Sequence, residues 1–410
     1  MKAGWQTNTL GELCDFQRGL TYKKGDEVDL SENIVLRATN IDLRTNLLDV
    51  SELKYISDEV TVPDSKKVKK DSLIICTASG SKSHLGKVAF IDEDYRYAFG
   101  GFMGMITPKT RLVPKYLFHL MTSPAYKDFI GELADGANIN NLTFDQLKRF
   151  EVPHPKPPEQ KRIVDILDQA FDGIATAKAN AEKNLQNARA LFESHLESVF
   201  TQHGDGWAEM PLGNVCELLN GFAFKRADAV SESQTQLVRM GNLYGNKLSL
   251  DRSPVFYPDS FAVDFHRYLL KNGDLILSLT GTFGKEDYGY TVRIPHCSHN
   301  LLMNQRIAKF DSVREALVIR DYLFYYLRSR AFLNILYPTA NGTRQGNLSS
   351  VTIKTLPIPI CSISEQRAIV EDADEMSESS QRLESIYQQK LAALEALKKS
   401  LLHQAFSGQL

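Results

Sequence analysis

The feature that most constrains this chain is an internal duplication with a period of about 200 residues. Trp5, Leu10, Gly11 and Cys14 recur 202 positions later as Trp207, Leu212, Gly213 and Cys216. The offset becomes 206 from residue 116 onward and holds to the end, where Glu159-Gln160 matches Glu365-Gln366. Solenoid repeats span only about 20 to 50 residues, so each copy is predicted to fold as a domain of its own.

Each copy begins with short apolar stretches separated by Gly, Asn, Asp and Pro, as in DSLIICTASG and GDLILSLTGT. This pattern is typical of a mixed α/β (α+β) domain. One helix is expected in each copy, in PKYLFHLMTSPAYKDFI from Pro114 and in IRDYLFYYLRSRAFLNIL from Ile319, because apolar residues recur there three and four apart.

Each copy ends in a long segment without proline, residues 159–200 and 365–406, which predicts two long helices. Their apolar residues keep the three-four alternation of a heptad seam: Ile163, Leu167, Ala170, Ile174, Ala177, Ala181, Ala188 and Leu191, then Ile369, Ala373, Met376, Leu383, Tyr387, Leu394, Leu397 and Leu401. We expect the two helices to pack together as a coiled coil. The alternative is that each packs only on its own domain.

Composition narrows the function classes. The chain is 43% hydrophobic and 24% charged, and it has no apolar run of the roughly 20 residues that a membrane span needs. Its beginning has no signal-peptide core and its five cysteines are dispersed, which favours a cytoplasmic location. The two long segments hold 10 Lys and Arg against 15 Asp and Glu, and the remainder holds 38 against 35. A modest basic excess in the globular parts suits selective contacts made by loops.

Three enzymatic interpretations find little support. The glycine-containing strings that end at Lys87 and Lys285 lack the spacing and the Ser or Thr of a phosphate-binding loop. His296, Cys297 and His299 have no second ligand pair at zinc spacing. The Asn/Asp-Pro-Pro-Tyr/Phe turn of adenine methyltransferases is absent, since Glu159 follows the proline pair.

Several duplicated motifs carry a family resemblance. They are a W…LG…C…G…K opening, a GDLILSLTGTFGK-type loop, the turns Asn141-Leu142-Thr143 and Asn347-Leu348-Ser349, the exit Pro357-Ile358-Pro359-Ile360, and EQKRIV or EQRAIV at the start of each long helix. In this order they resemble the specificity subunits of Type I restriction-modification systems. The resemblance spans the whole chain.

The resemblance implies two target recognition domains (residues 1–158 and 207–363), a central spacer helix with linker (159–206) and a C-terminal spacer helix (364–410). The helices are expected to be antiparallel and pseudo-twofold related. The implied partners are double-stranded DNA, two methyltransferase subunits and restriction subunits. The chain itself is expected to be non-catalytic and to hold no cofactor, with S-adenosylmethionine in the methyltransferase and ATP and Mg in the restriction subunit.

Base contacts require Arg, Lys, Asn, Gln, Ser or Thr on well-supported loops, and each copy offers three such loops. The candidates in the first copy are Arg18, Tyr22, Lys23 and Lys24, then Thr77, Ser79, Ser81, Lys82 and Lys87, then Asn138, Asn140 and Asn141. Those in the second copy are Lys225 and Arg226, then Thr280, Thr282 and Lys285, then Thr343, Arg344, Gln345 and Asn347.

The copies differ most in these loops, which predicts an asymmetric, interrupted target. For any single candidate, a solvated turn residue remains the alternative. Two other functions also stay open: the recognition part of a fused restriction or methylation enzyme, and a duplicated scaffold or ligand-binding protein that does not bind DNA.

Overall fold

The computed structural model describes residues 4–42, 44–135, 141–202 and 206–410. Its internal contacts divide the chain into two units. Unit 1 comprises Met1–Glu182 with Gln389–Leu410, and unit 2 comprises Lys183–Gln388. Each unit therefore holds one globular domain and parts of both long helices, and each is described by itself.

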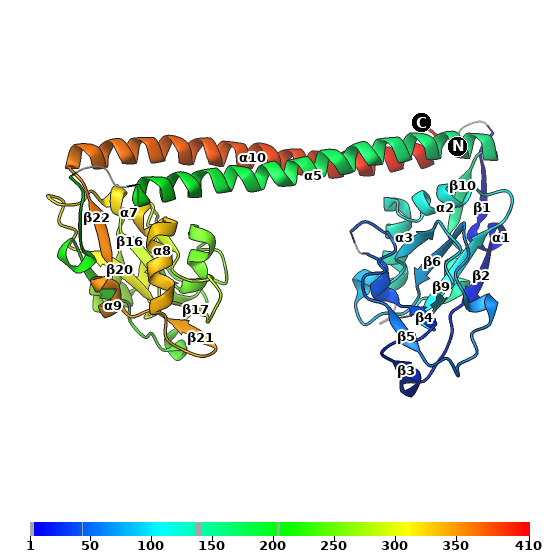
Figure 1. Cartoon of the computed structure of the whole chain (residues 1–410), viewed down its shortest axis with the longest axis horizontal. Helices are drawn as coiled ribbons and strands as arrows, with labels where there is room; N and C mark the ends of the chain where they lie inside the picture. Colours follow the sequence, from blue (N-terminus) through cyan, green and yellow to red (C-terminus); the bar gives the residue numbers. More distant parts are fainter. Residues whose placement is uncertain (1–3, 43, 136–140, 203–205) are drawn as a thin grey trace. The chain divides into compact units, whose positions relative to one another are not determined.

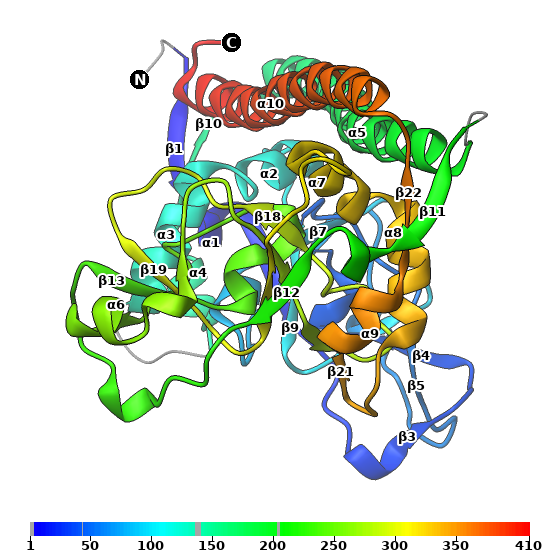
Figure 2. The ribbon, with the colours of Figure 1, turned by 90° about the vertical axis from the view of Figure 1, so that its left-hand side faces the viewer.

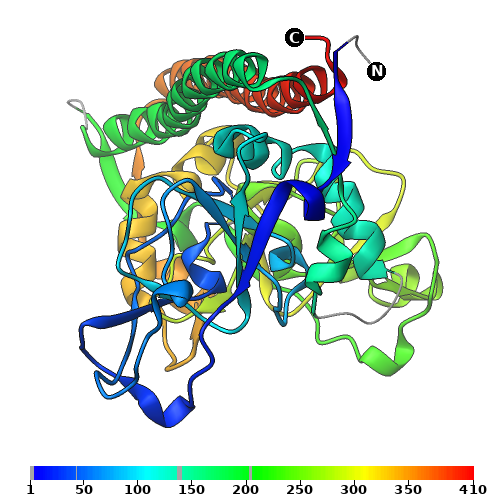
Figure 3. The same cartoon turned by 90° about the vertical axis from the view of Figure 1, so that its right-hand side faces the viewer.

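The core of unit 1 is a four-stranded antiparallel sheet in the order β2-β9-β6-β7, formed by Cys14–Arg18, Met103–Pro108, Ser72–Cys76 and Val88–Ile91. Strand β6 is buried along its whole length because both faces of the sheet are covered. Leu73 and Ile75 pack with the helical residues Tyr116 and Leu117, whereas Ile74 faces a second cluster. Figure 3 shows the helices of this unit over the sheet.

Two smaller sheets complete unit 1. The first has the order β3-β5-β4-β8, from Glu27–Val28, Lys54–Ile56, Asn33–Leu36 and Ala98–Phe99, and its β4·β8 pair is parallel. The second pairs β1 (Gln6–Thr9) with β10 (Glu151–His154), directly before the long helix (Figure 1).

Unit 2 contains counterparts of these three sheets, but its second sheet has its fourth strand at the opposite edge. Its central sheet has the order β12-β20-β16-β18, from Glu217–Asn220, Ile307–Asp311, Leu275–Ser278 and Thr291–Arg293. The second sheet is β14-β13-β19-β15, from Phe256–Tyr257, Thr235–Val238, Asn300–Met303 and Leu269–Leu270, and β11 (Ala208–Pro211) pairs with β22 (Pro357–Ile360) (Figure 2). The predicted pair of similar mixed α/β domains is confirmed.

The segment predicted as one helix in each domain is divided into two helices in the structure. In unit 1 they are α2 (Pro114–Leu120) and α3 (Pro124–Asp135). Pro124 lacks a backbone N–H and starts a new helix. In unit 2 they are α7 (Arg320–Arg328) and α8 (Arg330–Leu336), separated by Ser329, which caps α8 by accepting a hydrogen bond from the N–H of Phe332.

The long helices are α5 (Pro157–Thr201) and α10 (Ile363–Ser407). Within unit 1, Lys178 Nζ lies 2.5 Å from Glu395 Oε1. Within unit 2, Arg189 Nε lies 3.0 Å from Glu384 Oε2, and Ser380 Oγ donates to the carbonyl of Ala188 at 2.6 Å. In unit 1, Lys398 Nζ also lies 5.0 Å from the centre of the Phe171 ring, and in unit 2, His195 Nε2 also lies 3.1 Å from Asp372 Oδ2. From one such ion-pair or ring contact to the next in a unit, residue numbers rise along α5 as they fall along α10, so the predicted antiparallel packing is confirmed within each unit.

The predicted heptad seam is only partly correct. Leu191, Leu383 and Leu397 are 54, 37 and 47% exposed. Other buried residues near the helix ends lie outside the seam and pack into a domain core: Val164, Leu196 and Phe200 on α5, and Leu402 and Ala405 on α10. Each helix thus buries one stripe against its partner and, toward its ends, another against a domain. No described helix combines the length and the hydropathy needed to cross a bilayer.

Candidate nucleic-acid interface

In unit 2, the second and third predicted loops lie side by side. Strand β17 (Thr280–Thr282) pairs antiparallel with β21 (Gln345–Asn347), so that Thr280 faces Asn347 and Thr282 faces Gln345. Gly281 and Gly346 are opposite each other in this ribbon. A Cβ at either glycine would come within 3 Å of the side chain of Tyr288, which packs beneath the ribbon.

In the part of unit 1 that the structure describes, the corresponding loops meet at Ala78 and Asn141. Ala78 and Asn141 form an isolated bridge, and the N–H of Leu142 donates to the carbonyl of Thr77 at 2.7 Å. Ser79 and Ser81 follow on the same loop, and Ser81 Oγ lies 2.8 Å from that of Ser83. Asn138 and Asn140 lie outside the described residues, as does the side chain of Lys82.

The first loop leaves the central sheet at a glycine in both units. A Cβ on Gly19 would be 2.0 Å from the carbonyl oxygen of Gly100, and one on Gly221 would be 2.2 Å from that of Asn304. Only glycine permits this backbone approach. Tyr22, the half-buried candidate of this loop, has a pKa that is raised mainly by burial. The other candidates are exposed basic residues, Arg18 directly before the glycine and the rest after it: Arg18, Lys23, Lys24, Lys225 and Arg226.

A polar groove of about 420 Å³ joins all three loops in unit 2. Its lining includes Asn220 from the first loop, Thr280 from the second, and Gln345 and Asn347 from the third. Gln305 and Arg306 complete it and also line a neighbouring groove of about 410 Å³ with Arg239 and Arg252. These two grooves present cationic and amide side chains, the groups that bind phosphates and base edges.

Four of these groove residues were missed from the sequence: Arg239, Arg252, Gln305 and Arg306. Gln305 and Arg306 follow β19 after Asn304, and the N–H of Gln305 donates to the carbonyl of Phe222 in the first loop at 3.0 Å. The polar sequence NQR directly after a buried apolar strand could have indicated Gln305 and Arg306 as candidates. Its position beside the first loop depends on the parallel β13·β19 pairing, which the sequence does not reveal.

Two of the predicted contact residues have side chains that point inward instead of lying on the loop surface. Lys87 is buried, and its ammonium group donates to the carbonyl of Ile41. Thr280 is also buried, and its hydroxyl lies 2.8 Å from the sulfur of Met240, so only its backbone is available at the groove. Thr282 is exposed, but Asp287 accepts hydrogen bonds from its N–H and hydroxyl at 2.6 and 2.7 Å.

The remaining described candidates are exposed or half-buried on these loops: Thr77, Ser79, Ser81, Asn141, Lys285, Thr343, Arg344, Gln345 and Asn347. His296 and His299 flank Cys297, whose thiol donates to the carbonyl of His299 at 3.3 Å. Over the described ranges, no group of three or more His, Cys, Asp or Glu is placed to hold a metal ion.

Two similar mixed α/β domains, each with converging polar loops and a long paired helix, define a DNA specificity protein. The chain belongs to the family described as the Type I restriction modification DNA specificity domain, which matches residues 2–186 and 204–395. This membership makes it the specificity subunit, the non-catalytic component that recognises the DNA sequence in a restriction-modification complex. It does not support the scaffold or ligand-binding alternative.

Similar proteins agree with this assignment. The chain is 24% identical over 99% of its length to the specificity subunits of the Type I restriction enzymes StySPI of Salmonella potsdam and EcoKI of Escherichia coli K12, covering 89% of each. Its fold resembles a chain in a structure of the type I R-M system, with a TM-score of 0.80, 18% identity and coverage of 100% and 99%. It also resembles the HsdS subunit from Thermoanaerobacter tengcongensis, with a TM-score of 0.58 and 18% identity over 100% and 98% of the chains.

Proposed function

We propose that each domain contacts one half of an asymmetric, bipartite double-stranded DNA sequence, and that the long helices set the gap between the halves. The recognition domains are residues 1–158 and 207–363. The proposal is supported by loops that differ between two domains of the same framework, because identical loops would suit a palindrome and different loops suit two different half-sites.

Charge and position suggest a division of labour among the loop residues. The exposed cations of the first loop, Lys23 and Lys24 in one domain and Lys225 and Arg226 in the other, would bind phosphates and fix the register on the duplex. Arg306, Gln345 and Asn347 line the groove of unit 2 and carry groups that pair with guanine or adenine edges. Arg18, Thr77, Ser79, Ser81 and Asn141 would take this role in unit 1.

We further propose that two methyltransferase subunits, which carry S-adenosylmethionine, dock on the long helices and domains, and that restriction subunits with ATP and Mg join them in the cytoplasm. A base inside the duplex is out of reach of a methyltransferase, so the docked partner would flip the target adenine. This chain's own residues bind and orient the DNA and hold none of these cofactors.

The single observation that carries the proposal is the unit 2 groove, where Asn220, Arg306 and Gln345 from separate loops line one surface. The test is selection of bound duplexes from a random pool by this chain in complex with its methyltransferase. We expect one bipartite sequence, bound with strong salt dependence, whose scrambled half-sites fail to compete. Enrichment of no sequence, or of a continuous palindrome, would refute the proposal.

A further inference from the structure

A buried glutamine begins each long helix and ties it to its own domain. Gln160 is the fourth residue of α5 and is completely buried. Its Oε1 accepts from the N–H of Val113 at 2.7 Å, and its Nε2 donates to the carbonyls of Arg111 and Pro155 at 2.9 and 2.8 Å. One side chain thus joins the start of α2, the end of β10 and the start of α5.

Unit 2 contains the same junction. Gln366 is the fourth residue of α10 and is also completely buried. Its Oε1 accepts from the N–H of Ile319 at 2.9 Å, and its Nε2 donates to the carbonyls of Leu317 and Cys361 at 2.8 and 2.9 Å. Every hydrogen bond of Gln160 therefore has its counterpart 206 positions later.

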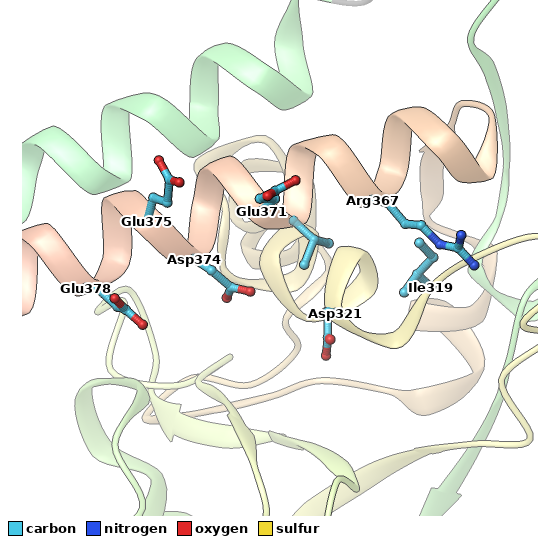
Figure 4. A pocket seen from close by; sticks show the side chains of 8 residues that line it. Ile319, Asp321, Arg367, Glu371, Asp374, Glu375 and Glu378 are labelled. Carbon is cyan, nitrogen blue, oxygen red and sulfur yellow. The ribbon is translucent and has the colours of Figure 1, made fainter.

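A second contact ties the same two helices together eight residues farther along each long helix. In unit 1, Asp168 Oδ1 lies 2.7 Å from His119 Nε2 and its Oδ2 lies 2.7 Å from Lys115 Nζ. In unit 2, Asp374 accepts a hydrogen bond from the hydroxyl of Tyr325. Figure 4 shows Ile319 at the start of α7 and Asp374 on the adjacent stretch of α10.

Two anchors about 12 Å apart fix the direction of a helix, whereas one anchor fixes only a point. Each long helix has 45 residues and is therefore about 68 Å long. A tilt of about 3° at the domain would move its far end by about 3.4 Å, the rise of one base pair. The direction in which the helix leaves the domain thus controls distances on the scale of single base pairs.

We infer that Gln160 and Gln366, with Asp168 and Asp374 as second anchors, are positioning residues that determine which gap length between the half-sites the complex accepts. This inference rests on the proposed function. It assigns to these residues no contact with DNA, and it predicts that their loss leaves the half-site sequences unchanged.

The test is methylation by the complete complex of duplexes carrying both half-sites, separated by the native gap or by gaps one base pair shorter or longer. Wild type should strongly prefer the native gap. Gln160→Met keeps the side-chain volume but removes all three hydrogen bonds, and we expect it to reduce that preference about tenfold while half-site preference stays the same. Equal gap preference in the variant and in wild type would overturn the inference.

Two further variants keep the test decisive. Asn33→Ala removes another amide, which donates to the carbonyls of Ser57 and Val60 in the sheet of β3, β4 and β5, and it should leave gap preference unchanged. If Gln160→Met does not fold, Tyr325→Phe breaks only the second anchor of unit 2 and should reduce gap preference about threefold. Wild type without preference for any bipartite duplex would instead refute the proposed function.

Discussion

The two domains share a framework of buried residues and differ in the loops that this framework supports. Buried residues recur in both domains. Gln160 and Gln366 make the same hydrogen bonds, and Cys14 and Cys216 are both buried thiols whose pKa desolvation raises to about 12. The loops do not recur in this way. In unit 2 they pair as the β17·β21 ribbon, and in unit 1, over its described residues, the corresponding contact is the single bridge of Ala78 and Asn141.

The grooves beside the long helices differ as well. In unit 2 the groove between α7 and α10 is lined by Asp321, Glu371, Asp374, Glu375 and Glu378, with Arg367 as its cation. In unit 1 the corresponding groove is mixed in charge, with the lysines Lys70, Lys115 and Lys161 and the aspartates Asp71, Asp92 and Asp165. We therefore expect the buried residues that recur in both domains to maintain the fold, and the exposed positions that differ between the domains to determine function.

The largest expected effect comes from disrupting the β17·β21 loop ribbon of unit 2. Gly281→Val would drive a branched side chain into Tyr288 and Asp287, so β17 and β21 should separate. We expect affinity for the full target to fall on the order of 1,000-fold, with the first half-site still recognised. Gly173→Ala, on an open face of α5, is the matched control. A variant that still selects both half-sites would contradict the role of the ribbon.

A smaller effect is expected from a single groove side chain. The pairings of Val238 with Met303 and of Leu36 with Phe99 make Phe102 the counterpart of Arg306. Arg306→Ala should lower affinity by about tenfold to a hundredfold and relax one base position in the second half-site. Phe102→Ala should alter only the first half-site. Competition with single-base variants of the target measures both, and a uniform loss across all positions would indicate a phosphate contact instead.

The second anchors differ in chemistry, and this predicts a pH dependence specific to unit 1. The hydrogen bond from His119, together with Lys115, lowers the pKa of Asp168 from 3.8 to about 2. Because the folded pKa is depressed, this contribution is present above pH 4 and is lost as the pH falls toward 2. Asp168 is one-third exposed, so we expect Asp168→Asn to reduce the unfolding free energy by only about 1 kcal/mol at pH 7.

Thermal unfolding between pH 2 and 7 measures this difference. It should disappear near pH 2, and Asp172→Asn, an exposed residue of the same helix, should show no such trend. A difference between wild type and Asp168→Asn that stayed constant with pH would mean that the ionised carboxylate contributes nothing.

The smallest effect concerns the helices themselves. In both units α5 supplies the cation and α10 the anion, as Lys178 with Glu395 and Arg189 with Glu384. Lys178→Glu should cost about 0.5 kcal/mol, and adding Glu395→Lys should restore it. A double-mutant cycle by chemical denaturation measures the coupling. Additive effects of the two changes would show that this ion pair does not help to align the helices.

The spacing of apolar residues in the sequence was sufficient to predict the main strands and the long helices of the framework. Strands β6 and β16 follow from their apolar runs. Both long helices were placed within two residues at each end, because no proline interrupts residues 159–200 or 365–406. The break at Pro124 was missed, since the apolar spacing continues across it. The seam was partly misassigned because near their ends the helices also contact the domains. The spacing of apolar residues along a helix does not tell the face that packs on the partner helix from the face that packs on a domain.

The loops were less predictable. The sequence indicated the polar residues but not their orientation, so Lys87 was assigned to the surface although its stem crosses the core to the carbonyl of Ile41. Arg239 and Arg306 were missed because they meet only through the pairing of distant strands. Which residues converge on a groove depends on topology, and local sequence does not encode it.

The central claim is that two domains with the same framework recognise different DNA sequences. The most direct test is methylome sequencing of cells that carry the complete system. Wild type should give one asymmetric bipartite motif, and removal of this chain should abolish it. Arg306→Ala should then change the second half of the motif and leave the first half and the gap intact. A palindromic or continuous motif, or simultaneous changes in both halves, would contradict the account.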